Sequence, residues 1–503
     1  MSPLPIFAKH QAAPTRYLID AAEHLASNLL RSHPELTIND HFRCLVPERL
    51  EDAPALHVDD LTTIARFAHI LDITFLQDRA ALRASAGDFV VSCLQPLPAF
   101  QSYCQDRLGL GTITWLWAEH HRPPEQVAVA CWTEPPIRNA LVRAIRAGAL
   151  RYLHPHMGNL PTWTTALLLR RAGNRPFSVI APPPELTRLV NDKIWFADIV
   201  RRLFGPEAVP HTTAAYNMAK LTTIVRTLAE RSDHIVIKHP SSAGGAGNVV
   251  IEAQKVAEFP LGRLRKRLRR MLAGLSWNGT GPLLVGSWQT RVLCAPSVQL
   301  WIPPAADGFP IVEGVFDQTI HGPQGRFVGS RPADLPPSVT QLLVDHCWVL
   351  GILFQRLGYV GRCSFDTLLV GEDVDHGRIQ FIECNGRWGG TSLPMTLMNR
   401  ILGDWTARPF VTGECTFKGL DRIAFDELLM HFDADLYDAR TGTGRLIFYN
   451  PGGIPTRSTV HVVGLGNTWE DADQLVRQEV PRGIRELTLN RGTRSPKRWA
   501  RVQ

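Results

Sequence analysis

Apolar and polar residues follow a helical period near the start of the chain and then switch between strand-like and helix-like patterns. Apolar spacing over residues 14–30 predicts an amphipathic helix. Residues 87–118 predict a strand, a turn, a helix and a second strand, while 126–132 and 135–150 predict a further strand and helix. This alternation favours an α/β fold with a parallel or mixed sheet covered by helices.

A proline cluster within residues 179–189 marks the first domain boundary, near residue 183. A helix is expected after it, starting near Asn191 or Asp192 and ending before Gly205. A hairpin should follow, with a serine- and glycine-rich tip over residues 241–247. Glycine permits close approach, so the backbone N–H groups of this tip could contact an anion.

The second half of the chain is predicted to be rich in strands. Residues 281–289, 295–302, 309–320, 359–370 and 378–386 have strand character, and a long helix is expected over residues 338–358. The last 75 or so residues predict a small α/β unit of strands and one helix.

Composition is that of an ordinary globular protein. The 503 residues are 45% hydrophobic and 20% charged, which excludes dominant disorder. The formal net charge of +7 suits anionic small substrates and is too weak to indicate nucleic acid without a localised stripe. Six cations between Arg263 and Arg270 could contact a polyanion, or could form the solvated face of an amphipathic helix.

Cysteine usage and the start of the chain give expectations about location. Nine scattered cysteines without a C-x-x-C pair indicate neither a disulfide framework nor a zinc site. The first residues lack the apolar segment of a signal peptide, and no run of about eighteen apolar residues occurs. We therefore expect a cytoplasmic protein that does not span a membrane.

Two carboxylates and an amide form the most informative cluster. Glu383 and Asn385 are two residues apart at a strand end, so their side chains face the same way. Antiparallel pairing about a turn at 374–375 places Asp366 opposite Glu383. An all-oxygen set suits Mg²⁺ shared with a nucleotide triphosphate. The alternatives are a polar strand face, which mutual repulsion of the two acids disfavours, and a glycosidase carboxylate pair.

Cations accompany this cluster. Lys238 lies in the strand before the glycine-rich tip, where it could either reach the site or be solvated at a sheet edge. Arg387 directly follows the cluster and Arg362 lies four residues before Asp366, so both could grip a carboxylate or phosphate. The alternative for each arginine is a surface salt bridge.

These residues, in this order, resemble the ATP-grasp superfamily, and are most similar to its pheganomycin-type peptide ligases. The resemblance covers about residues 150–425. It implies an N-terminal Rossmann-like pre-ATP-grasp domain (1–184), a two-lobed ATP-grasp fold (185–425) and a small C-terminal α/β extension (426–503). The nucleotide-lid lobe would span about 193–285 and the metal-site lobe about 286–425.

The resemblance also implies site roles. Nucleotide contacts would come from the lysines, the hairpin tip and the hinge strand, namely Lys193, Lys238, Ser241, Ser242, Gly244, Gly245, Gly247, Leu284, Val285 and Gly286. Metal ligands would be Asp366, Glu383 and Asn385, holding two Mg²⁺ ions, with Mn²⁺ as a substitute. Arg387, Arg362 and Lys238 would act in catalysis. Many relatives carry a hinge glutamate where this chain has Gly286 and Ser287.

The implied reaction is ATP-dependent ligation of a carboxylate to an amine, with ATP and Mg²⁺ as cofactors. The expected partners are small-molecule carboxylate and amine substrates, with neither nucleic acid nor a membrane, and a homodimer is expected. Three alternatives stay open: a phosphotransferase, a carboxylate–thiol ligase of the same fold, and a non-catalytic nucleotide-binding protein. Substrate identity and pathway are not encoded in these motifs.

Overall fold

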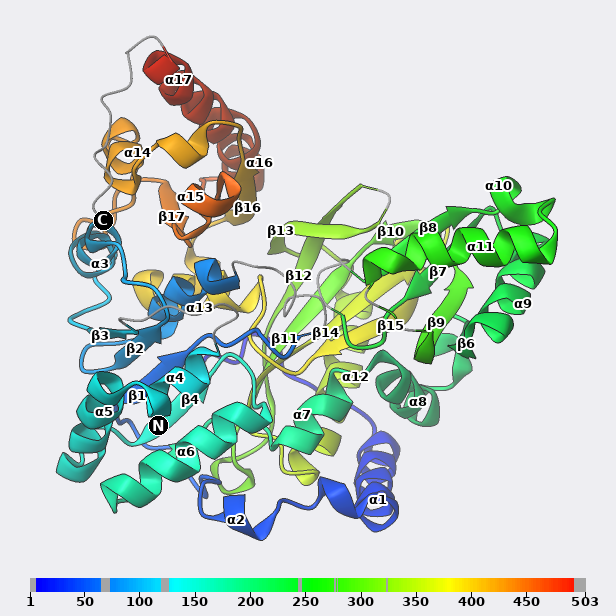
Figure 1. Ribbon diagram of the computed structural model, residues 1–503, viewed down its shortest axis with the longest axis horizontal. Coiled ribbons are helices and arrows are strands. Elements are labelled where there is room, and N and C mark those ends of the chain that lie inside the picture. Colours follow the sequence, from blue (N-terminus) through cyan, green and yellow to red (C-terminus); the bar gives the residue numbers. More distant parts are fainter. Residues whose placement is uncertain are drawn as a thin grey trace.

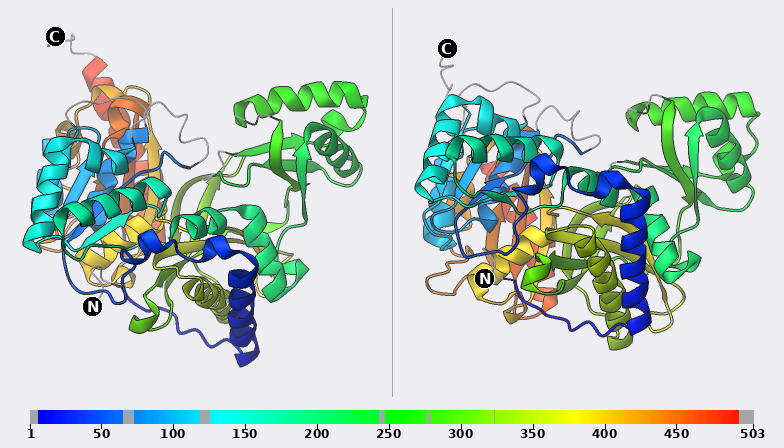
Figure 2. Two further views of the ribbon diagram at one scale, coloured as in Figure 1. Left: turned by 60° about the horizontal axis from the view of Figure 1, so that its bottom comes forward. Right: turned by 90° about the horizontal axis from the view of Figure 1, so that it is seen from below.

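The computed structural model of the chain describes residues 6–64, 73–118, 126–242, 247–275, 277, 279–322 and 324–492. Within these ranges the strands form four sheets. The central sheet lies between the N-terminal domain, the C-terminal domain and a lobe drawn in green (Figure 1). In Figure 2 that lobe, which we call the lid lobe, projects away from the rest of the molecule.

The N-terminal domain is built on a parallel sheet of order β3-β2-β1-β4-β5. Its core contains Leu56, Val91 and Leu153, all fully or almost fully buried. The strands are β1 (Ala55–Val58), β2 (Phe89–Ser92), β3 (Thr114–Trp117), β4 (Tyr152–Pro155) and β5 (Ser178–Val179). The helices are α2 (Asp40–Arg43), α3 (Pro98–Ser102), α4 (Val127–Thr133), α5 (Pro135–Ala147), α6 (Leu160–Gly173) and α7 (Pro184–Val190).

One predicted element of this domain is wrong. Residues 126–132 were expected to form a strand, and they form helix α4 instead. Val127, Ala128 and Cys131 share one helical face and are buried in the N-terminal core. A short run that is apolar at every position does not distinguish a buried strand from a buried helix.

The lid lobe carries an antiparallel sheet of order β6-β9-β7-β8. Leu264, Leu268 and Leu272 of α11 are buried in its core, while the six basic residues of that helix are exposed. The strands are β6 (Thr212–Asn217), β7 (His234–Lys238), β8 (Asn248–Glu252) and β9 (Thr280–Ser287), and the helices are α9 (Met218–Ala229), α10 (Gln254–Ala257) and α11 (Leu261–Leu272).

The central sheet is antiparallel, of order β10-β14-β11-β12-β13, with β15 paired to the other side of β14. Four helices, α1, α7, α8 and α12, share its core with the strands. The strands are β10 (Val292–Cys294), β11 (Pro296–Ile302), β12 (Ile311–His321), β13 (Arg326–Pro332), β14 (Gly361–Val370) and β15 (Arg378–Asn385). The helices are α1 (Arg16–Ser32), α8 (Lys193–Phe204), α12 (Pro337–Arg356) and α13 (Ser392–Leu402).

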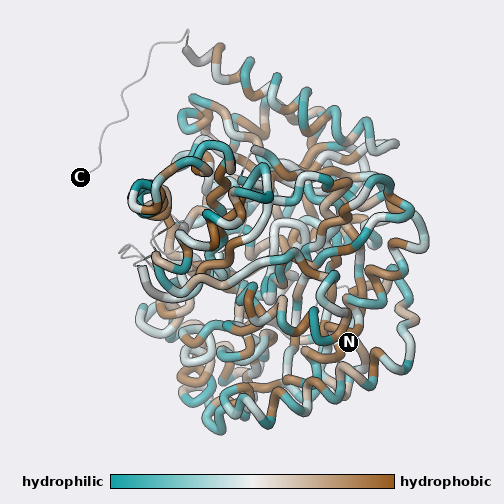
Figure 3. Tube along the Cα trace, turned by 90° about the vertical axis from the view of Figure 1, so that its right-hand side faces the viewer, coloured by the Kyte–Doolittle hydropathy of each residue, from teal (hydrophilic) through white to brown (hydrophobic). Residues whose placement is uncertain are grey.

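The first helix belongs to this central core. Leu25 and Leu29 of α1 are buried with Leu343 and Leu350 of α12. The proposed N-terminal domain, residues 1–184, therefore begins with a helix that packs on another part of the molecule. Figure 3 shows hydrophobic and hydrophilic residues interleaved along the helices.

The C-terminal domain contains a three-stranded antiparallel sheet of order β16-β18-β17. Because β16 pairs with β18, the sheet begins before the proposed boundary at residue 425. Its strands are β16 (Phe410–Thr416), β17 (Leu446–Tyr449) and β18 (Thr459–Leu465), and its helices are α14 (Phe425–His431), α15 (Gly453–Arg457), α16 (Trp469–Gln474) and α17 (Val480–Gly492).

Helix α12 is the one helix in the described ranges that is long and apolar enough to cross a membrane. It packs against α1, β11 and β12, and just over half of its most apolar window, 56%, is buried. Its hydrophobicity is therefore accounted for by its place in the core.

Candidate active site

The two acidic residues of the cluster face each other across β14 and β15. Asp366 pairs with Glu383 in the strand register, and Ser364 pairs with Asn385. The intervening Phe365 and Cys384 are buried in the core on the opposite face. The strand period therefore turns the polar side chains toward one cavity, as the sequence predicts.

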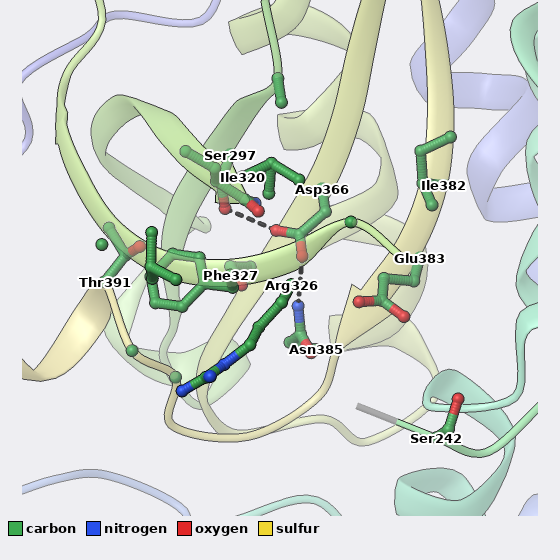
Figure 4. A pocket seen from close by; sticks show the side chains of 18 of the residues that line it. Ser242, Ser297, Ile320, Arg326, Phe327, Asp366, Ile382, Glu383, Asn385 and Thr391 are labelled. Atoms are coloured by element: carbon green, nitrogen blue, oxygen red, sulfur yellow. Dashed lines mark hydrogen bonds between the residues drawn. The ribbon is translucent and has the colours of Figure 1, made fainter. Parts of the chain in front are cut away.

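Asp366 is held by two hydrogen bonds (Figure 4). The hydroxyl of Ser297 on β11 donates to Oδ1 at 2.6 Å, and the amide nitrogen of Asn385 donates to Oδ2 at 2.8 Å. Burial and, to a lesser extent, the neighbouring Glu383 raise the pKa of Asp366, and the two hydrogen bonds lower it, so that the net pKa is about 6. The amide oxygen of Asn385 is the group that this residue can offer to a cation.

Lys193 joins the lid lobe to the acidic pair. It opens α8, where the Asp192 side chain caps the helix by accepting from the backbone N–H groups of Ile194 and Trp195. Its Nζ lies 2.6 Å from Oε2 of Glu383 and donates to the carbonyl oxygen of Ser242 at 2.6 Å. Burial alone would raise the pKa of Glu383, but Lys193 and other cations hold it below its usual value.

Lys238 ends β7 and lines the same cavity. Burial and, to a lesser extent, the positive charge of Lys193 lower the pKa of Lys238, while Glu383 raises it, so that the net pKa is about 8. An anion placed between the two lysines would offset their mutual repulsion and the cost of burying the Lys238 ammonium. The two lysines therefore provide an electrostatic environment that suits a phosphate group.

The hairpin beyond Lys238 is tightly packed at its base. Ser242 donates to the carbonyl oxygen of His239 at 3.0 Å, and Gly247 returns the chain to β8. A Cβ at Gly247 would lie 1.9 Å from Oγ of Ser242, so no larger residue fits there without movement. Ser241 lies at the exposed start of the tip. The proposed contacts at Gly244 and Gly245 lie outside the described residues.

Arg387 also lines the cavity. Its NH1 donates to Oδ1 of Asn191, which also accepts from the backbone N–H of Gly386 at 3.1 Å. Burial lowers the pKa of Arg387, while Glu383 and Asp366 raise it. Asn191 therefore positions this guanidinium beside the acidic pair, and the sequence singled out Asn191 only as a helix start.

Arg362 does not line the cavity, contrary to the prediction that it reaches the same space. It forms a fully buried ion pair with Glu313 on β12. Its guanidinium lies 5.0 Å from the ring centre of Trp388 and 5.5 Å from that of Trp301. Arg362 is therefore a core residue, neither the substrate ligand nor the surface salt bridge that were expected.

The hinge prediction is shifted by a few residues. Leu284, Val285 and Gly286 all pair with β6 on one side and β7 on the other, so their backbone lies inside the lid sheet. The cavity is lined instead by the residues that follow, 287–289. The missed signal is the end of β9 at Ser287, where backbone groups become available for a ligand.

One cavity of about 970 Å³ is lined by the acidic pair, Asn385, the two lysines and Arg387. In the described part of the chain no three His, Cys, Asp or Glu residues cluster into a closed metal cage. Two carboxylates and one amide oxygen at an open cavity fit a hard cation that keeps waters and shares ligands with a substrate. The donor set therefore fits Mg²⁺.

The sequence matches no family model, and comparison with curated proteins gave no match. Comparison of structures gave an ADP complex of PurK, an N5-carboxyaminoimidazole ribonucleotide synthetase, at 13% identity and a TM-score of 0.50. The alignment covers 88% of this chain and 99% of that chain.

Two further structures are similar. The biotin carboxylase domain of Hydrogenobacter thermophilus 2-oxoglutarate carboxylase, with MgADP, ADP and bicarbonate, is 14% identical with a TM-score of 0.48. The alignment covers 86% of this chain and 93% of that one. The Staphylococcus aureus N5-carboxyaminoimidazole synthetase with ADP is 10% identical over 87% and 100% of the two chains, with a TM-score of 0.48. The likeness to PurK, together with the sheets described above, shows that this chain has an ATP-grasp fold.

Proposed function

We propose that the protein is an ATP-dependent ligase that activates a carboxylate as an acyl phosphate and joins it to an amine. The observation that carries the proposal is the convergence of two lysines, Lys193 and Lys238, with the Asp366–Glu383–Asn385 set on one cavity. Cations for phosphate and oxygen ligands for Mg²⁺ are what phosphoryl transfer requires. The solved PurK structure with ADP supports the choice of nucleotide, and the all-oxygen donor set supports the choice of ion.

In this proposal the γ-phosphoryl group of ATP moves to a carboxylate oxygen as its bond to the β-phosphate oxygen breaks. An amine then attacks the acyl carbon, the C–N bond forms, the bond to the phosphate oxygen breaks, and the amine proton is lost. Asp366, Glu383 and Asn385 would hold Mg²⁺, which when bound neutralises phosphate charge. We propose two such ions.

Different side chains of the protein would bind the phosphates and orient the carboxylate substrate. Lys193 and Lys238 place fixed positive charge where the phosphates would lie, and Arg387 would orient the carboxylate substrate. Closure of the lid lobe would exclude water from the acyl phosphate, whose hydrolysis would waste ATP. Backbone groups of residues 287–289 are the proposed adenine contacts. The cytoplasmic location and the homodimer stay predictions. Light scattering can test the homodimer.

The first test is Mg²⁺-dependent ADP release with a panel of carboxylates and with hydroxylamine as a trap. A hydroxamate that forms with one carboxylate shows an acyl phosphate and names the donor. ADP release without hydroxamate indicates a phosphotransferase or an uncoupled ATPase, and a faster rate with thiols than with amines indicates a thiol ligase. A folded, ATP-binding protein that releases no ADP supports the non-catalytic alternative.

Glu383→Gln should lower this activity by a factor on the order of 10² or more, because the metal loses a charged ligand and Lys193 loses its partner. Glu372→Gln is the matched control, since Glu372 is exposed in the loop between the same two strands and pairs with Arg291. Unchanged hydroxamate formation in Glu383→Gln contradicts the metal assignment.

A further inference from the structure

The cavity continues beyond the acidic pair to a second wall formed by the C-terminal sheet. Its lining there includes Glu414 of β16, Asn450 after β17 and His461 of β18. Arg326 of β13 connects the two walls, because it lines the same cavity as Asp366 and Asn385 (Figure 4) and forms an ion pair with Glu414. We call the part of the cavity between the C-terminal sheet and the N-terminal domain the second chamber.

The second chamber adjoins the carboxyl edge of the N-terminal sheet. Strand order reverses between β1 and β4, and ligands of open α/β sheets bind at such a reversal. His156, directly after β4, lines the cavity there, as does Arg79, whose Nε donates to Asp59 after β1 at 2.8 Å. This position is independent support for a ligand in the chamber.

A donor–acceptor pair lies on the C-terminal wall. The amide nitrogen of Asn450 donates to Nδ1 of His461 at 3.0 Å. Burial lowers the pKa of His461 to about 4, so the ring is neutral and carries its proton on Nε2. The amide oxygen of Asn450 is buried and has no hydrogen-bond partner in the described part of the chain. Leaving a buried carbonyl unpaired is costly, and a ligand N–H would satisfy it.

The mouth of the chamber carries an unpaired cation. Arg457 lies over the ring of Phe75, 5.0 Å from its centre. Arg79 pairs with Asp59, and Arg326 pairs with Glu414. In the part of the chain that the structure describes, Arg457 has no acidic partner within ion-pair distance. A guanidinium in this state favours a carboxylate or another planar anion.

Part of the chamber lining is apolar. Phe75 and Leu76 contribute to it and belong to a small buried cluster with Leu61, Ile64 and Met157. The chamber thus combines an apolar wall, an unpaired carbonyl with a neighbouring imidazole, and a free guanidinium. Small-molecule sites typically have a mainly apolar lining with a small number of precisely placed polar groups.

We propose that the second chamber binds the amine substrate, and that this substrate is peptide-like: an amide N–H for Asn450, a free carboxylate for Arg457 and an apolar side group against Phe75. This inference rests on the proposed ligase function and names its acceptor class. The carboxylate at Arg457 is a recognition group, since the activated carboxylate must lie at the Asp366–Glu383 wall. Its amine would face the acyl phosphate.

The test is calorimetric binding of L-alanyl-L-leucine and of its C-terminal amide to the full chain, with Mg²⁺ and a nonhydrolysable ATP analogue. The free acid should bind the unaltered protein about tenfold or more tightly than the amide, through the charge-assisted contact. Arg457→Gln should remove this preference. Arg485→Gln should keep it, because Arg485 stacks on Phe417 at 5.6 Å in the same domain but does not line the cavity.

Asn450→Gly gives a second readout. Asn450 has a positive φ of 57°, which glycine adopts freely, so the turn is kept while the amide is lost. The affinities for the two dipeptides should fall by the same factor. Absence of dipeptide binding to the unaltered protein, or an unchanged acid preference in Arg457→Gln, overturns the inference. Failure of the ATP analogue to bind overturns the proposed function instead, so the two failures are distinguishable.

Discussion

Asp366 and Glu383 lie opposite each other, yet their surroundings move their pKa values in opposite directions. Burial raises the pKa of Asp366, while Lys193 holds that of Glu383 low. One acid of the pair is therefore always charged near neutral pH. Asp366, with a pKa of about 6, becomes protonated as the pH falls below 6, and a divalent cation would oppose this protonation. Metal binding and proton release are therefore expected to be coupled at mildly acidic pH.

The pKa of Lys238, lowered to about 8 mainly by burial, gives a pH-dependence at the same scale. Below pH 8 the ammonium is charged and can hold a phosphate; above pH 8 the free protein carries a neutral amine. We expect the affinity for an ATP analogue to fall as pH rises from 7.5 to 9.5, as measured by fluorescence titration. Lys238→Met should bind more weakly at pH 7 and show a flatter profile, whereas an unchanged profile contradicts the assignment.

The buried ion pair of Arg362 and Glu313 contributes to the stability of the fold. Both side chains are buried, so Glu313→Gln leaves an uncompensated guanidinium between two tryptophans. We expect the free energy of unfolding to fall by about 3–5 kcal/mol in denaturant titration. The double variant Arg362→Met with Glu313→Leu should recover most of this loss. Equal losses in the single and double variants would contradict the ion-pair account.

Among the elements, the lid hairpin is the most sensitive to side-chain size. In Gly247→Ala the new Cβ would collide with Ser242, whose carbonyl oxygen accepts from Lys193. We expect the affinity for the ATP analogue to fall by about tenfold, roughly the loss of one charge-assisted hydrogen bond. Thermal unfolding should change little, because the hairpin lies at an edge of the lid sheet.

Gly262→Ala is the matched control for this variant. Gly262 lies in α11 of the same lobe, and a Cβ there meets no atom within 4 Å. Alanine in a helix is favoured over glycine by roughly 0.5–1 kcal/mol, so this variant should be equally or more stable and bind normally. Similar binding losses in both variants would show that the hairpin packing is not the cause.

Element prediction from the sequence succeeded where a turn or a helix cap defined the pattern, and failed for the uniformly apolar run over residues 126–132. Equal spacing from one turn is enough to pair Asp366 with Glu383, and capping by Asp192 is enough to start α8. The prediction that Arg362 reaches the site failed because its partner Glu313 lies on a strand that the local pattern cannot align with it. Strands β1 and β4 have only four residues each, which is too short for an alternation of apolar and polar residues to identify them in the sequence.

At the scale of the molecule, the cavity is a property of the whole chain. Its lining comes from the N-terminal domain, the lid lobe, the central sheet and the C-terminal sheet. No local motif could predict the second chamber, because Arg79, Arg326 and Arg457 become neighbours of one cavity only in the folded chain. The roles of these residues remain proposals, whereas their convergence is a feature of the structure.

The packing of α1 has a consequence for synthesis on the ribosome. Helix α1 ends at Ser32, but its partner α12 begins only at Pro337. At about 5–20 residues per second, the apolar face of α1 would wait on the order of tens of seconds for its partner. During translation this face is a natural binding site for a chaperone, and the central core can close only after most of the chain has left the exit tunnel.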